Sequence, residues 1–150
     1  MNLRSLTMVG MMLLLAACAT GQSSSTTSGN AAPGSREDFI QNVGDRVFFD
    51  FDKSDIKPEG QQTLERQATW LKKYANVKVT VEGHCDDRGT REYNLALGNR
   101  RADAVKRALI ALGIDSGRIT TISYGKERPA VVGDNEEAWA QNRRGVTVIN

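Results

Sequence analysis

The sequence has few of the residues that build metal sites and nucleophilic active sites. Its 150 residues include a single histidine, His84, and only two cysteines, Cys18 and Cys85. One histidine excludes zinc sites that need two, and so few thiols exclude a cysteine-rich site. No serine lies in a nucleophile-elbow sequence, and Asp86-Asp87 lacks further oxygen ligands at the spacing of a calcium loop. We therefore expect no enzyme activity and no metal ion or cofactor, and we expect His84 to be a hydrogen-bonded structural residue.

The sequence also has no large excess of charge of either sign and no long apolar run. The 20 basic and 18 acidic residues give a formal net charge of +2. This balance favours neither nucleic acid nor an anionic membrane surface as a partner. The apolar run at residues 9–15 is much shorter than the ~20 residues that span a bilayer. We interpret this run as part of an export signal rather than as a transmembrane helix.

The N-terminus has the three parts of such a signal. Arg4 supplies positive charge, residues 9–15 form the apolar region, and Ala16 and Ala17 are the small residues before a cleavage point. These parts predict that the protein leaves the cytoplasm.

The four residues at 15–18, Leu-Ala-Ala-Cys, resemble a bacterial lipobox. This resemblance implies that residues 1–17 are removed and that Cys18 is lipidated, which would anchor the chain stably in a membrane. Position 19 is Ala rather than Asp, and by resemblance to such lipoproteins this favours the outer membrane, with the domain facing the periplasm. The alternative is an ordinary secretory signal with an incidental cysteine.

Residues 18–35 separate the signal from the rest of the chain. After Cys18 they contain no charged and no aromatic residue, which is typical of a flexible linker. Residues 36–150 then have the length and composition of one globular domain. If Cys18 carries lipid, Cys85 has no disulfide partner, and we expect it to be a small buried apolar residue rather than a reactive thiol.

Strand and helix patterns alternate along the domain. Alternating side chains predict strands, and apolar side chains at helical spacing predict helices. The predicted elements are a strand at 46–51, a helix from Pro58 to about 75, a strand at 77–83, a helix from Thr90 to Gly113, a strand at 119–124, a helix at 136–142 and a strand at 146–149. This β-α-β-α-β-α-β order favours an α+β or mixed α/β domain with its helices packed on one sheet. The pattern does not determine the order of the strands in the sheet.

The densest group of polar residues follows the second predicted strand, at 83–90. A strand end that leads into a helix N-terminus is well placed to bind a ligand. On the helix that follows, Asn94, Leu97 and Arg101 lie on one stripe because they are three and four residues apart. Arg101 interrupts an otherwise apolar face and therefore needs an anion, from the protein or from a ligand.

Asp86 and Arg101 together admit two interpretations. Asp86 accepts hydrogen bonds from an ammonium group, and a guanidinium holds a carboxylate through two hydrogen bonds. The pair could therefore bind the zwitterionic end of a small amino-acid ligand. Alternatively, the two residues form an internal salt bridge that fixes the loop to the helix. Their spacing alone does not decide between these interpretations.

Four stretches of the sequence resemble, in order, the OmpA-like peptidoglycan-binding domain. They are residues 47–56, 79–105, 123–129 and 142–144, and the similarity extends over most of residues 45–149. The resemblance implies a mixed four-stranded sheet and non-covalent binding of meso-diaminopimelate in the stem peptide of peptidoglycan. The lipobox and the short linker are typical of the lipid-anchored members of this family, which act in the Tol–Pal system.

The resemblance also implies which residues bind the ligand. The family's aspartate after Gly-His and a small residue is Asp86, and its helix arginine before alanine is Arg101. Further positions around the pocket match Asp52, Asn94, Leu97 and Arg144. A TolB-like periplasmic propeller protein is the implied protein partner, with a binding surface that overlaps this pocket.

The function that these features predict is to tether the outer membrane to the cell wall. In the family this tether supports envelope integrity and constriction of the outer membrane at cell division. The alternative is another lipoprotein of the same family that acts mainly as a protein-interaction module.

Overall fold

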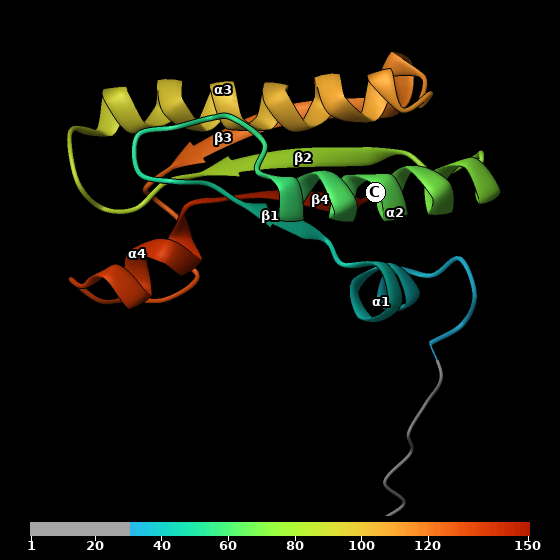
Figure 1. Ribbon diagram of the computed structural model, residues 1–150, viewed down its shortest axis with the longest axis horizontal. Coiled ribbons are helices and arrows are strands. Elements are labelled where there is room, and N and C mark those ends of the chain that lie inside the picture. The colour runs from blue at the N-terminus through green and yellow to red at the C-terminus, as the bar shows by residue number, and fades with distance from the viewer. Residues whose placement is uncertain (1–30) are drawn as a thin grey trace, which may run out of the picture.

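The computed structural model describes residues 31–150, so the export signal, Cys18 and the first part of the linker lie outside the described residues. The described chain forms a four-stranded sheet with two long helices packed on it (Figure 1). This arrangement confirms the fold class predicted from the sequence. Within residues 31–150, no helix is both long enough and apolar enough to cross a bilayer.

The sheet is mixed. Its strands are β1 (Arg46–Phe48), β2 (Val79–His84), β3 (Ile119–Gly125) and β4 (Arg144–Ile149), in the order β1-β4-β2-β3. Strands β2 and β3 are parallel, whereas β4 runs antiparallel to both β1 and β2. The last strand of the chain therefore lies inside the sheet. The sheet is complete only when this C-terminal strand has paired with β1 and β2.

Helices α2 (Pro58–Lys73) and α3 (Arg91–Ala111) share one hydrophobic core with the sheet. Pro58 occupies the first turn of α2. Thr90 caps α3, because its hydroxyl accepts a hydrogen bond from the backbone N–H of Tyr93. Helix α2 lies over β1, and α3 lies over β2 and β3.

Two short helical segments complete the C-terminal half. The 3-10 turn η2 (Ser116–Arg118) leads into β3. Helix α4 (Glu136–Asn142) begins after Asn135, whose side-chain oxygen accepts a hydrogen bond from the backbone N–H of Ala138. The helix predicted at 136–142 is therefore confirmed.

The bounds of all four strands differ from the prediction, by one residue at the end of β3 and by more in the other strands. The strand predicted at 46–51 ends at Phe48, because the chain then turns and the N–H of Lys53 bonds to the carbonyl of Asp50. The last strand begins two residues earlier than predicted, at Arg144. The first difference matters for the site, because it leaves the residues after β1 free to form a loop.

An N-terminal helical segment was not predicted. It consists of α1 (Arg36–Asp38) and the π-helical turn η1 (Phe39–Val43). Phe39 is fully buried, with its ring centroid 4.9 Å from that of Trp70, and the indole N–H of Trp70 donates to Asp38 at 2.8 Å. So short a segment is stabilised by tertiary contacts rather than by its own propensity, which explains why the sequence pattern missed it.

Two glycines allow α3 to lie directly against the sheet. A Cβ on Gly83 of β2 would overlap the carbonyl oxygen of Gly98 in α3, and a Cβ on Gly98 would overlap the hydroxyl of Ser123 in β3. Glycine at both positions therefore permits a close contact that a side chain would obstruct. The contact brings the first turns of α3 to the edge of the sheet where β1, β2 and β3 end (Figure 1).

Candidate functional site

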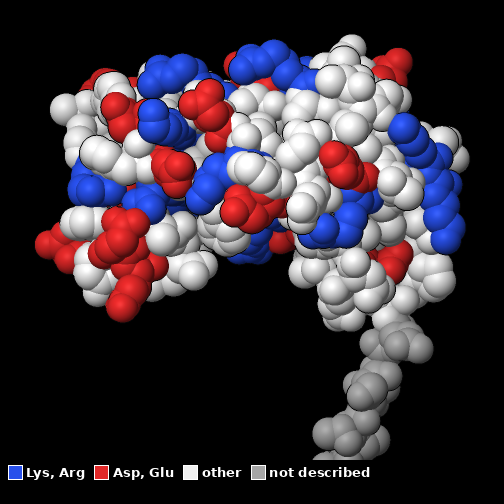
Figure 2. Space-filling view, viewed as in Figure 1, with Lys and Arg blue, Asp and Glu red and all other residues white. Residues whose placement is uncertain are grey.

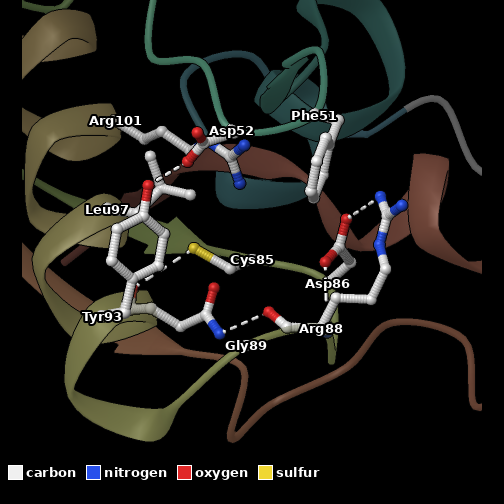
Figure 3. Close-up of a pocket in the computed structure, with 10 residues that line it drawn as sticks. Phe51, Asp52, Cys85, Asp86, Arg88, Gly89, Tyr93, Leu97 and Arg101 are labelled. Atoms are coloured by element: carbon white, nitrogen blue, oxygen red, sulfur yellow. Dashed lines mark hydrogen bonds and ion pairs between the residues drawn. The ribbon is translucent and has the colours of Figure 1, made fainter.

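A cavity of about 190 Å³ opens at this edge of the sheet. Its walls come from the loop after β1, from the segment between β2 and α3, and from the first turns of α3 (Figure 3). The lining residues are Phe51, Asp52, Cys85, Asp86, Arg88, Gly89, Tyr93, Asn94, Leu97 and Arg101. All the residues that the family resemblance implied, except Arg144, therefore lie together at one cavity.

Arg101 reaches the cavity from the buried face of α3. The residue is only 1% exposed, and its guanidinium donates to the backbone carbonyls of Lys53, His84 and Asp50 at 2.8, 2.9 and 3.1 Å. Burial lowers the pKa of Arg101. Among residues 31–150, no carboxylate pairs with this guanidinium. The buried cation is held by neutral groups, so an anionic ligand would compensate its charge.

Asp86 occupies another wall of the cavity (Figure 3). Its Oδ2 accepts from Nη2 of Arg88 at 2.8 Å and lies 3.4 Å from Nη1 of Arg143, while its Oδ1 accepts the backbone N–H of Arg88 at 3.2 Å. Burial alone would raise the pKa of Asp86, but these bonds outweigh burial and hold the pKa below its usual value. In the described part of the chain, the internal salt bridge considered for Asp86 is made with Arg88 and Arg143 rather than with Arg101.

Asn94 and Leu97 shape the cavity from α3. The Asn94 side chain is buried and donates to the carbonyls of Arg88 and Thr90 at 2.9 and 3.0 Å, which fixes the loop before the helix. Leu97 is 4% exposed and adds an apolar wall. The cavity therefore combines charged groups with an apolar surface, as many small-molecule sites do.

Asp52 and Tyr93 join the loop after β1 to α3. Asp52 has a left-handed backbone conformation, with φ at 56°, and its carboxylate accepts a hydrogen bond from the hydroxyl of Tyr93. This hydrogen bond raises the pKa of Tyr93. The contact holds two segments of the cavity wall together although they are far apart in the sequence.

Arg144 does not line this cavity, which corrects the position implied by the resemblance. It is the first residue of β4, and its guanidinium donates to the carbonyls of Asn142 and Arg128 at 3.3 and 3.1 Å, over a separate hollow on the sheet. The neighbouring Arg143 is the one beside Asp86. Consecutive residues of an extended chain point to opposite sides, so only one of these two arginines can reach Asp86.

Cys85 and His84 are both buried at the end of β2. Burial raises the pKa of the Cys85 thiol to about 11, and its Sγ donates to the carbonyl of Asn94 at 3.3 Å. Nε2 of His84 lies 3.1 Å from the Glu82 carboxylate, and burial lowers the pKa of this histidine. These surroundings match the structural roles expected for both residues. Residues 31–150 contain no cluster of three or more metal-ligating side chains that could hold an ion.

The side chains of Phe51, Arg88 and Tyr93 line the cavity but were not predicted as binding residues, and neither was Arg143, which contacts Asp86. Arg88 stood within the polar run that was singled out, and Tyr93 precedes Leu97 by one helical turn, so the helical stripe could have included it. Phe51 carried no such signal. Its ring is exposed, at 55%, and lies at the cavity beside Arg88 (Figure 3).

Charges of both signs cover the surface. Figure 2 shows Lys and Arg interspersed with Asp and Glu over the visible face, with acidic side chains gathered over α4, whose first turn carries Glu136 and Glu137. No single-sign field extends across this face, so selectivity at the cavity depends on the groups that line it.

Comparison with known proteins places this geometry in context. Residues 48–143 match the sequence model of the OmpA family. The chain is 57% identical over 122 residues to the peptidoglycan-associated lipoprotein of Agrobacterium fabrum, which covers 81% of this chain and 69% of that protein. It is 50% identical over 147 residues to the peptidoglycan-associated lipoprotein of Brucella melitensis, with 93% and 88% covered. The crystal structure of the peptidoglycan-associated lipoprotein from Burkholderia pseudomallei superimposes with a TM-score of 0.73 at 38% identity and covers 77% of this chain and 100% of that one.

Proposed function

Because this chain belongs to the OmpA family and is similar to peptidoglycan-associated lipoproteins over most of its length, we propose that it binds peptidoglycan without a covalent bond. The ligand in this proposal is meso-diaminopimelate of the stem peptide. Beyond its peptide linkage, that residue ends in a free ammonium group and a free carboxylate. The relatives are named as lipoproteins rather than as enzymes, which supports binding rather than catalysis.

One observation carries the proposal: a buried cation and a buried anion line the same cavity without pairing to each other. Arg101 lacks an anionic partner among the described residues, so its guanidinium is available to hold the ligand carboxylate. Asp86 accepts the ligand ammonium. The ligand's two charges then match the two side chains, and the buried Arg101 cation gains a partner of opposite sign.

Isolated sacculi and the detergent-purified full chain provide the test. We expect Asp86→Asn and Arg101→Gln each to weaken binding roughly 30-fold or more, because each leaves a buried charge without a matching partner. Asp87→Asn and Arg100→Gln are matched controls, since both residues are exposed neighbours that do not line the cavity. Free diaminopimelate-containing peptide should displace the wild type. Retention of either variant at the wild-type level, or failure of the peptide to compete, would contradict the proposal.

The proposal extends to the membrane. Lipid on Cys18, which lies outside the described residues, would hold the N-terminus in the outer membrane, and residues 18–35 would link it to the periplasmic domain. Two or more acyl chains suffice for stable anchoring. Many anchored copies near the cell wall would act together, so weak individual binding is sufficient for a tether. Radiolabelled fatty acid should enter the wild type and not a Cys18→Ser variant.

A TolB-like propeller protein of the Tol–Pal system is the protein partner in this proposal. Phe51, which is 55% exposed, lines the cavity, and Val132, which is 91% exposed, lines a second hollow that shares Cys85 with it. Exposed apolar groups around a charged pocket are suited to a protein contact. Peptidoglycan and the propeller protein should then compete, and the tether would contribute to envelope integrity and to constriction of the outer membrane at division. Simultaneous binding of both partners to one molecule would contradict the overlap.

A further inference from the structure

Asp86 already has a cation bound to it. Nη2 of Arg88 lies 2.8 Å from Oδ2 of Asp86, and the backbone N–H of Arg88 bonds to Oδ1 at 3.2 Å (Figure 3). The guanidinium stands where an ammonium group of a ligand would stand. A ligand ammonium group must therefore compete with the Arg88 guanidinium for this carboxylate.

Two aromatic rings hold this guanidinium in place. The central carbon of the Arg88 guanidinium lies 3.9 Å from the ring centroid of Phe51 and 3.9 Å from that of Trp139. Cations over aromatic faces are attracted by the ring quadrupole, and arginine also stacks on such faces. The rings come from the loop after β1 and from α4, so the seat of Arg88 is assembled from three distant segments.

Not every polar atom around the Arg88 side chain has a hydrogen-bond partner, however. Nε of Arg88 and Nε1 of Trp139 are both buried and have no hydrogen-bond partner among the described residues. A buried donor without an acceptor destabilises the arrangement that buries it. Both donors regain water if Arg88 swings out, and its side chain is already 31% exposed. Arg88 is therefore bound at Asp86 but is able to leave.

Arg143, the second cation at Asp86, is held more firmly than Arg88. The side chain of Arg143 is 8% exposed, and it is also held by the carbonyl of Phe49 at 3.0 Å and by Glu136 at 2.6 Å. Its Nη1 is 3.4 Å from Asp86, farther than Nη2 of Arg88. Of the two arginines, Arg88 is the one that can exchange.

We propose that Arg88 is a built-in competitor for the ammonium group of the ligand, so that binding exchanges the Arg88 guanidinium for that ammonium at Asp86. One positive charge leaves as another arrives, so the carboxylate is never buried alone. A ligand that carries a carboxylate but no ammonium cannot make this exchange. Arg88 is thus a specificity-determining residue that selects a zwitterionic end. This inference rests on the proposed function.

Isothermal titration of the detergent-purified full chain tests the exchange with two peptides. One carries diaminopimelate with its free amine, and the other carries the same residue N-acetylated at that amine. We expect Arg88→Gln to bind the free-amine peptide about threefold to tenfold more tightly, because no ion pair and no cation–π contacts need to be displaced. We expect no gain for the acetylated peptide. Arg91→Gln is the matched control, since Arg91 is exposed, pairs with Glu127 and does not line the cavity.

A second variant, Arg88→Lys, tests whether the effect of Arg88→Gln comes from the glutamine side chain itself. Arg88→Lys keeps the charge and loses the planar group that stacks between the rings, so its gain should be smaller but of the same sign. If the wild type binds the free-amine peptide and Arg88→Gln binds it equally or more weakly, this inference alone is overturned. An equal gain for both peptides would also overturn it. No binding of the free-amine peptide to the wild type would instead overturn the proposed function and this inference with it.

Discussion

Nη1 of Arg143 lies 3.4 Å from Oδ2 of Asp86, although 57 residues separate them in the sequence. Asp86 follows β2, and Arg143 lies between α4 and β4. The contact therefore ties the C-terminal segment to the wall of the candidate site. It makes Arg143 a residue that positions Asp86 from behind rather than one that faces the ligand.

Replacing Arg143 should weaken both the fold and the site. Arg143→Gln removes a buried cation from Asp86 and breaks the bonds to Phe49 and Glu136. We expect the free energy of unfolding to fall by about 2–3 kcal/mol, less than for a pair that is broken completely, because Arg88 still compensates Asp86. Urea denaturation measures this loss. The same charge change at exposed Arg107 serves as the control, and equal losses in the two variants would show that the buried contact is unimportant.

Stability should depend on pH through His84, the single histidine of the chain. Burial, followed by the nearby Arg144 charge, lowers its pKa, whereas the bond to Glu82 acts the other way. Below the usual histidine pKa of about 6.5, the unfolded chain takes up a proton that the folded chain resists. Stability is therefore complete above that pH and declines as the pH falls through it. Denaturation curves between about pH 5 and pH 8 should show this slope in the wild type and a flatter one in His84→Gln.

The glycine contact between α3 and the sheet should not tolerate a methyl group. Gly83→Ala would collide with backbone at Gly98, and we expect a loss of about 3 kcal/mol. Gly98→Ala collides mainly with the hydroxyl of Ser123, so adding Ser123→Ala should restore part of the loss. Thermal unfolding of the single and double variants measures the coupling. If Ser123→Ala restores nothing, the hydroxyl is not the obstacle.

The thiol of Cys85 should be nearly inert in the folded protein. Burial raises its pKa to about 11, and the reactive thiolate is therefore scarce at neutral pH. In a Cys18→Ser variant, which leaves one thiol, labelling with a maleimide should be slow in buffer and fast in denaturant. Rapid labelling in buffer without loss of structure would contradict the burial described here.

Local sequence patterns predicted the parts of the fold that depend on neighbouring residues. The start of α3 follows from Thr90 as a cap, and the position of Arg101 on its stripe follows from helical periodicity. Both are determined within a few residues of the chain. The two residues that the resemblance placed at the heart of the site, Asp86 and Arg101, do line one cavity.

The rest depends on contacts between distant residues, which spacing does not encode. The carbonyls that hold Arg101 come from residues 17, 48 and 51 positions away. The central place of β4 in the sheet depends on pairing with strands from both halves of the chain. The choice of Arg143 rather than Arg144 depends on where α4 ends, a difference of one residue that reverses the direction of a side chain.

The direction of β1 has a mechanical consequence. The described chain begins beside α1 at one end of the sheet, and β1 leads from there to the end that carries the cavity (Figure 1). If one end of the domain is held by the membrane and the other by the cell wall, tension runs nearly along the strands. The force on the ladder between β1 and β4 is then a shear force, because its hydrogen bonds lie perpendicular to the strands. Those bonds must fail together rather than one after another, so the domain resists pulling along the axis on which a tether is pulled.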